Sequence, residues 1–314
     1  MIQDKPLSGM LLMTGFCILA PLGDAFAKIL GETVPLGQLL LVRFALQAAL
    51  LIPVVWLMRG SLRMPMRLLH LTVLRTILHI LGIAAMFASL RFLPLADAIA
   101  IAFVMPFLML LLGRFVLGEE VGPYRLMACL VGFAGTLLVI QPNYAAVGAP
   151  ALLPLGVAVA FALFMMVTRS IAKATDPISL QAISGLIATA ILGSAWLAFS
   201  SADVPGLGFV SLEGREIWLL GAIGVLGTVA HLLMTWSLRL APAATLAPMQ
   251  YLELPFATLI GFVIFSDLPD TLASLGILLT ICSGLYVIHR EQVAARRQAA
   301  AVVGASPANA GSKA

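Results

Sequence analysis

SLRFLP at residues 89–94 returns 148 positions later as SLRLAP at residues 237–242. The same offset relates further pairs along the chain: Gly113 and Gly261, Glu119 and Asp267, Leu137 and Leu285, and the Val-Ile pairs at 139–140 and 287–288. The chain is therefore built from two copies of one unit. If each copy crosses a membrane an odd number of times, the second copy runs upside down relative to the first.

The composition places the chain in a membrane. Of its 314 residues, 61% are hydrophobic and only 10% are charged, and the mean hydropathy is +1.09. Soluble domains are about 25% charged. The net charge of +4 does not indicate nucleic acid, because the basic residues lie mostly between apolar blocks. Cys17, Cys129 and Cys282 all lie within apolar stretches, which predicts neither a disulfide framework nor a metal site.

Ten blocks of about 20 mostly apolar residues are long enough to cross the hydrocarbon core as helices. Strands of a membrane barrel are about half as long and alternate in polarity, so we expect an all-α membrane protein. Five spans per copy is an odd number, which predicts ten transmembrane helices as two inverted five-helix repeats. The blocks are residues 8–30, 36–58, 68–90, 95–117, 123–140, 151–171, 178–199, 217–238, 244–265 and 271–289.

These blocks divide the chain into a first repeat at residues 1–145 and a second at 146–290, followed by a tail at 291–314. Ala, Arg, Gly and Ser dominate the tail, so we expect it to be disordered. With the N-terminus in the cytoplasm, 13 of the 18 Lys and Arg residues fall on the cytoplasmic side and three on the other. The positive-inside rule therefore predicts a multi-pass protein of a bacterial-type inner membrane with both termini cytoplasmic.

Inverted repeats are typical of secondary transporters, which bind their substrates near mid-membrane where helices are interrupted. The sequence has no Gly-x-x-x-x-Gly-Lys-Ser/Thr phosphate-binding loop, so it does not indicate that this chain uses ATP directly to drive transport. His-Glu-x-x-His and Gly-x-Ser-x-Gly motifs are also missing, which disfavours a membrane enzyme. A filter-like polar run or charge ring, the pattern of a channel, is not seen either.

The chain resembles the drug/metabolite transporter superfamily, EamA type, in features that cover residues 8–289. These are Lys28 at the end of the first block, Arg43-Phe44 early in the second, Pro106 and then LGEE at 117–120, and Pro255 followed by FSD at 265–267. The resemblance implies a ten-span permease for a small metabolite, in a family that carries amino acids, sugars and vitamins including riboflavin. The second copy departs from it, with Ser-Asp where many members have Gly-Glu.

Glu253 is the deepest acidic residue, near the centre of the ninth block. Pro255 cannot donate a backbone hydrogen bond, so it disturbs the helix near Tyr251. Gln250, Tyr251 and Glu253 are therefore candidates for a polar pocket that binds substrate or a proton, because ionisable groups at mid-membrane are functional candidates. The alternative is a structural glutamate that ties two helices together.

Four further charged residues lie near block ends. Asp24 and Lys28 are four residues apart, so they share a helix face as a self-neutralising pair or as a gate at the outer mouth. Arg43 either reaches the outer face, with Asp24 or Asp97 as its partner, or binds an anionic group of the substrate. Asp97 follows Pro94 closely, which favours an N-cap or first-turn role over a gating role.

Arg75 and His79 share a face of the third block, and we expect Arg75 to snorkel to the cytoplasmic interface. His79 and His231 lie deeper and are candidate substrate or proton groups, although packing is the commoner role of such histidines. Nothing at metal spacing accompanies them, so no metal site is predicted. Aromatic residues and methionines of several blocks are candidates for a cavity wall, and the glycines of the eighth block, Gly221, Gly224 and Gly227, favour close helix contacts.

The sequence therefore predicts a secondary active transporter that moves a small metabolite by alternating access, coupled to a proton. Within this class, a riboflavin-type vitamin importer and an exporter of amino acids or other metabolites stay open. A membrane enzyme or a non-transporting membrane protein is the alternative from another class. No cofactor or nucleic acid is expected, the bilayer and a small-molecule substrate are the partners, and a monomer or a homodimer fits a chain that carries both halves of a pathway.

Overall fold

The computed structural model describes residues 5–116, 118, 122–199, 206 and 208–304, and within these ranges the chain is helical with no strand. Glu119 and Glu120 and the last ten residues, 305–314, lie outside the described residues. In chain order the helices are α1 (Pro6–Leu30), α2 (Leu36–Leu57), α3 (Met66–Ser89), α4 (Leu95–Ala102), α5 (Met105–Phe115), α6 (Pro123–Val147), the 3₁₀ helix η1 (Ala149–Leu152), α7 (Leu153–Ala172), α8 (Pro177–Phe199), α9 (Gly214–Leu240), α10 (Ala243–Leu246), the 3₁₀ helix η2 (Ala247–Leu252), α11 (Glu253–Phe265) and α12 (Thr271–Gly304).

The predicted all-α membrane fold is confirmed. Eight helical segments in the described ranges are long and apolar enough to cross a membrane, and α4 with α5 counts as one of them. Two shorter apolar helices, Met249–Phe265 and Thr271–Tyr286, occupy the ninth and tenth predicted blocks. Large apolar side chains such as Leu11, Trp56 and Leu57 are exposed on the outside of the bundle. An apolar exterior of this kind suits a lipid environment.

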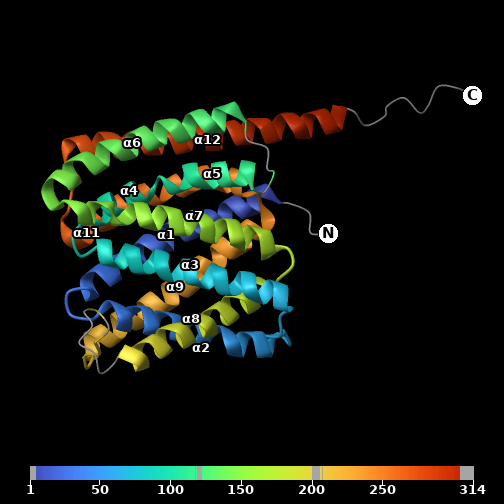
Figure 1. Ribbon diagram of the computed structural model, residues 1–314. Coiled ribbons are helices and arrows are strands. Elements are labelled where there is room, and N and C mark those ends of the chain that lie inside the picture. Colours follow the sequence, from blue (N-terminus) through green and yellow to red (C-terminus); the bar gives the residue numbers. More distant parts are fainter. Residues whose placement is uncertain (1–4, 117, 119–121, 200–205, 207, 305–314) are drawn as a thin grey trace, which may run out of the picture.

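The helix pairs follow the two copies found in the sequence (Figure 1). Helix α1 packs against α9 and α3 against α7, while α2 packs on α8 and α6 on α12. In a twofold relation α1, α2, α3 and α6 correspond to α7, α8, α9 and α12. That relation converts the α1–α9 pair into the α7–α3 pair and leaves the other two pairs unchanged. The packing therefore has the symmetry that an internal repeat predicts.

The fourth and ninth apolar blocks occupy equivalent positions in the two copies, and in both the helix is interrupted. The fourth changes from α4 to α5 at Phe103 and Val104, and Pro106 lies in the first turn of α5. The ninth passes through η2, and Pro255 lies in the first turn of α11. A proline removes one backbone donor and crowds the preceding turn, which explains why each helix restarts near its proline. The two breaks bring irregular backbone to equivalent places in the two copies.

Two boundaries differ from the prediction. Helix α6 continues past residue 145 to Val147 and stops at Gly148, whose φ is 71°. Helix α12 continues to Gly304, so the predicted disorder at 291–304 is wrong (Figure 1). That segment is rich in Ala, Arg and Gln, which are strong helix formers, and it extends an existing helix without the cost of a new nucleus.

Candidate functional site

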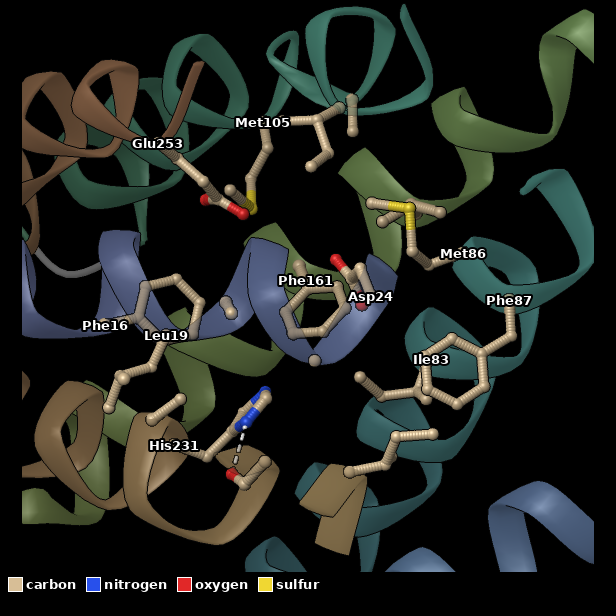
Figure 2. Close-up of a pocket in the computed structure, with 18 of the residues that line it drawn as sticks. Phe16, Leu19, Asp24, Ile83, Met86, Phe87, Met105, Phe161, His231 and Glu253 are labelled. Carbon is tan, nitrogen blue, oxygen red and sulfur yellow. Dashed lines mark hydrogen bonds between the residues drawn. The ribbon is translucent and has the colours of Figure 1, made fainter. Parts of the chain in front are cut away.

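A cavity lies inside the bundle where the two interrupted blocks approach α1, α3, α7 and α9 (Figure 2). Its empty space is about 720 Å³, a figure that includes the space open at its mouth. The wall is mostly apolar, and Asp24, Arg43, His231 and Glu253 are its ionisable members. The apolar wall includes Phe16, Ile83, Met86, Phe87, Ile99, Phe103, Met105, Val157, Phe161, Met165 and Ile223.

Glu253 is the first residue of α11, directly after η2. Its side chain is 7% exposed, and Figure 2 shows its carboxyl oxygens turned into the cavity near Met105. No described residue forms a hydrogen bond or ion pair with this carboxyl. Asp24 of α1 lines the same cavity and lies close enough for the two carboxyl charges to interact. The cavity therefore holds two acidic groups in an apolar setting, as proton-carrying sites in membranes do.

Gln250 and Tyr251 lie outside the cavity wall, so the pocket predicted around Glu253 contains only one of its three residues. Gln250 is buried, with its Nε2 atom 2.9 Å from the sulfur of Met165. Tyr251 packs its ring against Phe103 at 5.5 Å and turns its hydroxyl toward Gly132 of α6. Successive residues of a 3₁₀ helix point about 120° apart, which sends these side chains in different directions.

Lys28 and Asp24 do not form the predicted pair. The Lys28 ammonium lies 3.2 Å from Asp267, in the segment after α11, and 3.1 Å from the Leu93 carbonyl before α4. Asp24 lies one turn earlier on α1 and lines the cavity instead. Lys28 thus joins α1 to the ends of both interrupted blocks. Such an ion pair is suited to a gate, because it connects segments from the two copies.

Arg43 is buried at 2% exposure and does not reach the outer face. Its Nη2 atom lies 3.3 Å from His231 Nδ1, and its guanidinium lies over the Phe44 ring at 4.7 Å. Nη1 has no hydrogen-bond partner in the described part of the chain. Neither Asp24 nor Asp97 forms an ion pair with it within 4.0 Å, although the charge of Asp24 acts on it.

His79 and His231 come together, which the sequence did not indicate. Their ring centroids are 4.3 Å apart, and His79 stacks on Phe164 at 4.6 Å. His231 lines the cavity and His79 lies behind it. Both nitrogens of His79 and Nε2 of His231 have no partner among the described residues. Those residues contain no group of three His, Cys, Asp or Glu that could hold a metal ion.

A buried polar network containing Arg75 was missed by the sequence reasoning. Arg75 has no exposed surface, so the predicted snorkelling is wrong. Its guanidinium donates to hydroxyl oxygens on three helices: Thr168 at 2.8 Å, Ser184 at 2.7 Å and Thr235 at 3.4 Å. Gln181 donates to Thr235 at 2.9 Å and so extends the network. Threonine and serine are common in membrane helices, and no spacing signals that they meet one arginine.

Asp97 lies in the first turn of α4, as predicted, but Pro94 is the residue at the N-cap. One carboxyl oxygen accepts a hydrogen bond of 3.0 Å from Asn143 of α6. The other has no partner in the described ranges. Asp97 therefore ties the start of α4 to α6 and lies outside the cavity wall.

A bundle of apolar helices, an internal repeat and a small-molecule cavity at two interrupted helices define a membrane transporter of the secondary type. A model of the EamA-like transporter family matches residues 7–141 and again residues 149–289, one match for each copy. The chain belongs to the EamA-like transporter family, which confirms the resemblance seen in the sequence.

Individual relatives agree with this membership. A riboflavin transporter of Rhizobium johnstonii is 31% identical over 230 residues, 73% of either chain. An S-adenosylmethionine uptake transporter of Rickettsia felis is 24% identical over 276 residues, 88% of this chain and 90% of the relative. A protein crystal structure with 21% identity covers 94% of this chain and 99% of its own, with a TM-score of 0.65, which establishes a shared fold.

Proposed function

We propose that the protein imports riboflavin or a closely similar planar metabolite across the bacterial cytoplasmic membrane by alternating access, coupled to a proton on Glu253. The observation that supports this proposal is a cavity with an aromatic and methionine wall and two carboxyls, formed where both interrupted blocks meet α1. Planar rings are bound well by such walls, because aromatic and sulfur contacts add to apolar burial. The Rhizobium relative supports the choice of riboflavin.

The position of Glu253 supports the proposed proton coupling. Its carboxyl faces the cavity without a fixed partner among the described residues, so binding a proton there disrupts no structural bond. Asp24 shares the cavity and makes a second negative charge unfavourable. Protonation of Glu253 and entry of substrate are therefore linked through one small space. The positive-inside bias supports cytoplasmic termini.

A direct test uses purified protein in liposomes with the outside one pH unit more acidic than the inside. One proton per substrate allows up to about tenfold accumulation of riboflavin. Glu253→Gln keeps the shape of the side chain, so this variant should exchange riboflavin across the membrane but accumulate none. Glu32→Gln is the matched control, because Glu32 is exposed and lies outside the cavity.

Accumulation by Glu253→Gln equal to that of the unmodified protein contradicts the coupling role. Failure of the unmodified protein to carry riboflavin contradicts the proposed substrate. S-adenosylmethionine is the second candidate, because its sulfonium cation matches the two carboxyls of the cavity and a relative is named for its uptake. Competition between the two compounds in the same liposomes decides between them.

A further inference from the structure

Arg43 and Asp24 offer a hydrogen-bond donor and an acceptor that do not satisfy each other. Both line the cavity, and the charge of each acts on the other. They nevertheless form no ion pair within 4.0 Å. The Nη1 atom of Arg43 is buried and has no partner among the described residues. A buried guanidinium nitrogen without a partner is costly, so a ligand that bonds to it gains affinity.

Gly227 of α9 leaves room for the Arg43 guanidinium. A Cβ atom at Gly227 would lie 2.9 Å from Nε and 3.0 Å from Nη2 of Arg43, so a larger residue there requires the guanidinium to move. The Nη2 atom also lies 3.3 Å from Nδ1 of His231 on α9, and the same Nδ1 lies 2.9 Å from the Gly227 carbonyl oxygen. An added Cβ atom at Gly224 would meet Leu46, and one at Gly221 would have nothing within 4 Å. Of these three glycines of α9, Gly227 is therefore the one that lies against Arg43.

The wall beside this donor and acceptor suits a flat ring. Phe16 and Phe161 both contact His231, at ring-centroid distances of 5.6 Å and 6.1 Å. Figure 2 shows Phe161 and Asp24 near the centre of the view, Phe16 to the left, and Met86 and Phe87 to the right. Asp24 and Arg43 line the cavity beside these apolar side chains.

We infer that Arg43 and Asp24 together recognise an imide edge, C(=O)–NH–C(=O), on the ring of the substrate, and that Gly227 positions Arg43 for this contact. Arg43 donates to a carbonyl oxygen and Asp24 accepts from the N–H. The dione ring of riboflavin carries such an edge. The inference therefore rests on the proposed function and adds the residues that recognise the ring. A methyl group on the imide nitrogen removes the donor and fills the space beside Asp24.

The test measures equilibrium binding of riboflavin and N3-methylriboflavin to the purified full-length protein by quenching of ligand fluorescence. The unmodified protein should bind riboflavin at least about tenfold more tightly, since a lost bond to a charged group costs that much or more. Asp24→Ala should reduce the preference to within about twofold. Arg43→Gln and Gly227→Ala should weaken both ligands about tenfold or more, while Gly221→Ala should change neither.

Equal binding of the two ligands by the unmodified protein, or an undiminished preference in Asp24→Ala, overturns the inference while the proposed function stands. Normal affinity in Gly227→Ala overturns the positioning role. No binding of riboflavin by the unmodified protein overturns the proposed substrate and this inference with it. If Arg43→Gln does not fold, Arg43→Lys takes its place. Lysine keeps the positive charge but lacks the planar guanidinium with its several N–H donors. Normal riboflavin affinity in this variant contradicts the role of Arg43.

Discussion

Replacing Gly135 of α6 by alanine tests how closely the two copies meet outside the cavity. Gly135 lies against α12, where an added Cβ atom would be 2.6 Å from the Gly276 carbonyl oxygen and 2.5 Å from the Thr280 hydroxyl. The hydroxyl can rotate, but the carbonyl belongs to the backbone of α12. To restore ordinary contact the two helices must separate locally by about 0.8 Å.

The expected loss of stability follows from this separation. Inserting a methyl group into a close-packed seam costs about 1–3 kcal/mol. The same movement stretches two hydrogen bonds between the helices, from Thr280 to the Gly132 carbonyl and from Ser283 to the Ala128 carbonyl. Bonds of this kind in membranes contribute about 0.6 kcal/mol each. The better helix propensity of alanine offsets up to about 1 kcal/mol, so we expect a net loss of about 1–3 kcal/mol.

Reversible unfolding in detergent micelles measures this loss, with Gly156→Ala as the matched control. Gly156 is an exposed residue of α7 with nothing within 4 Å of an added Cβ, so the control should keep or slightly gain stability. Neither glycine lines the cavity, so riboflavin affinity should be unchanged in both variants. A Gly135→Ala protein as stable as the control refutes the close approach of α6 and α12.

Two further predictions concern the gate and the topology. Asp267→Asn removes the ion pair with Lys28, which is partly exposed and contributes about 1 kcal/mol at most. Opening of the cavity at the Lys28 end should therefore rise, by up to about fivefold. The labelling rate of a cysteine placed at Ala20 in the cavity wall measures this opening, and an unchanged rate contradicts the gating role. Epitope tags inserted at 117–122 and at 266–270 should be accessible from opposite sides of the membrane, and accessibility from one side contradicts the inverted repeat.

The buried network around Arg75 lies outside the cavity wall. It joins α3, α7, α8 and α9 through hydroxyl groups rather than through a carboxylate. Hydrogen bonds from a charged guanidinium are stronger than those between neutral groups, and losing them leaves the buried charge of Arg75 uncompensated, so this network holds the four helices together.

The sequence alone determined the class of protein, the membrane fold and the repeat. These follow from composition, block length and the 148-residue offset, which are one-dimensional properties of the chain. It also placed Glu253 at a helix interruption, because Pro255 removes a backbone hydrogen bond whatever the helix packs against. It did not predict that residues 291–304 continue α12, because the helix propensity of Ala, Arg and Gln outweighs the low hydropathy of this segment.

The tertiary structure decided which polar residues meet. His79 pairs with His231, and Lys28 pairs with Asp267 rather than with Asp24, across separations in the chain that helix periodicity does not report. Periodicity says which residues share a face of one helix, but not which other helix covers that face. The role of Gly227 likewise depends on Arg43 approaching from α2. The chain therefore encodes its transporter class locally, while its binding site exists only where the packed helices bring distant residues together.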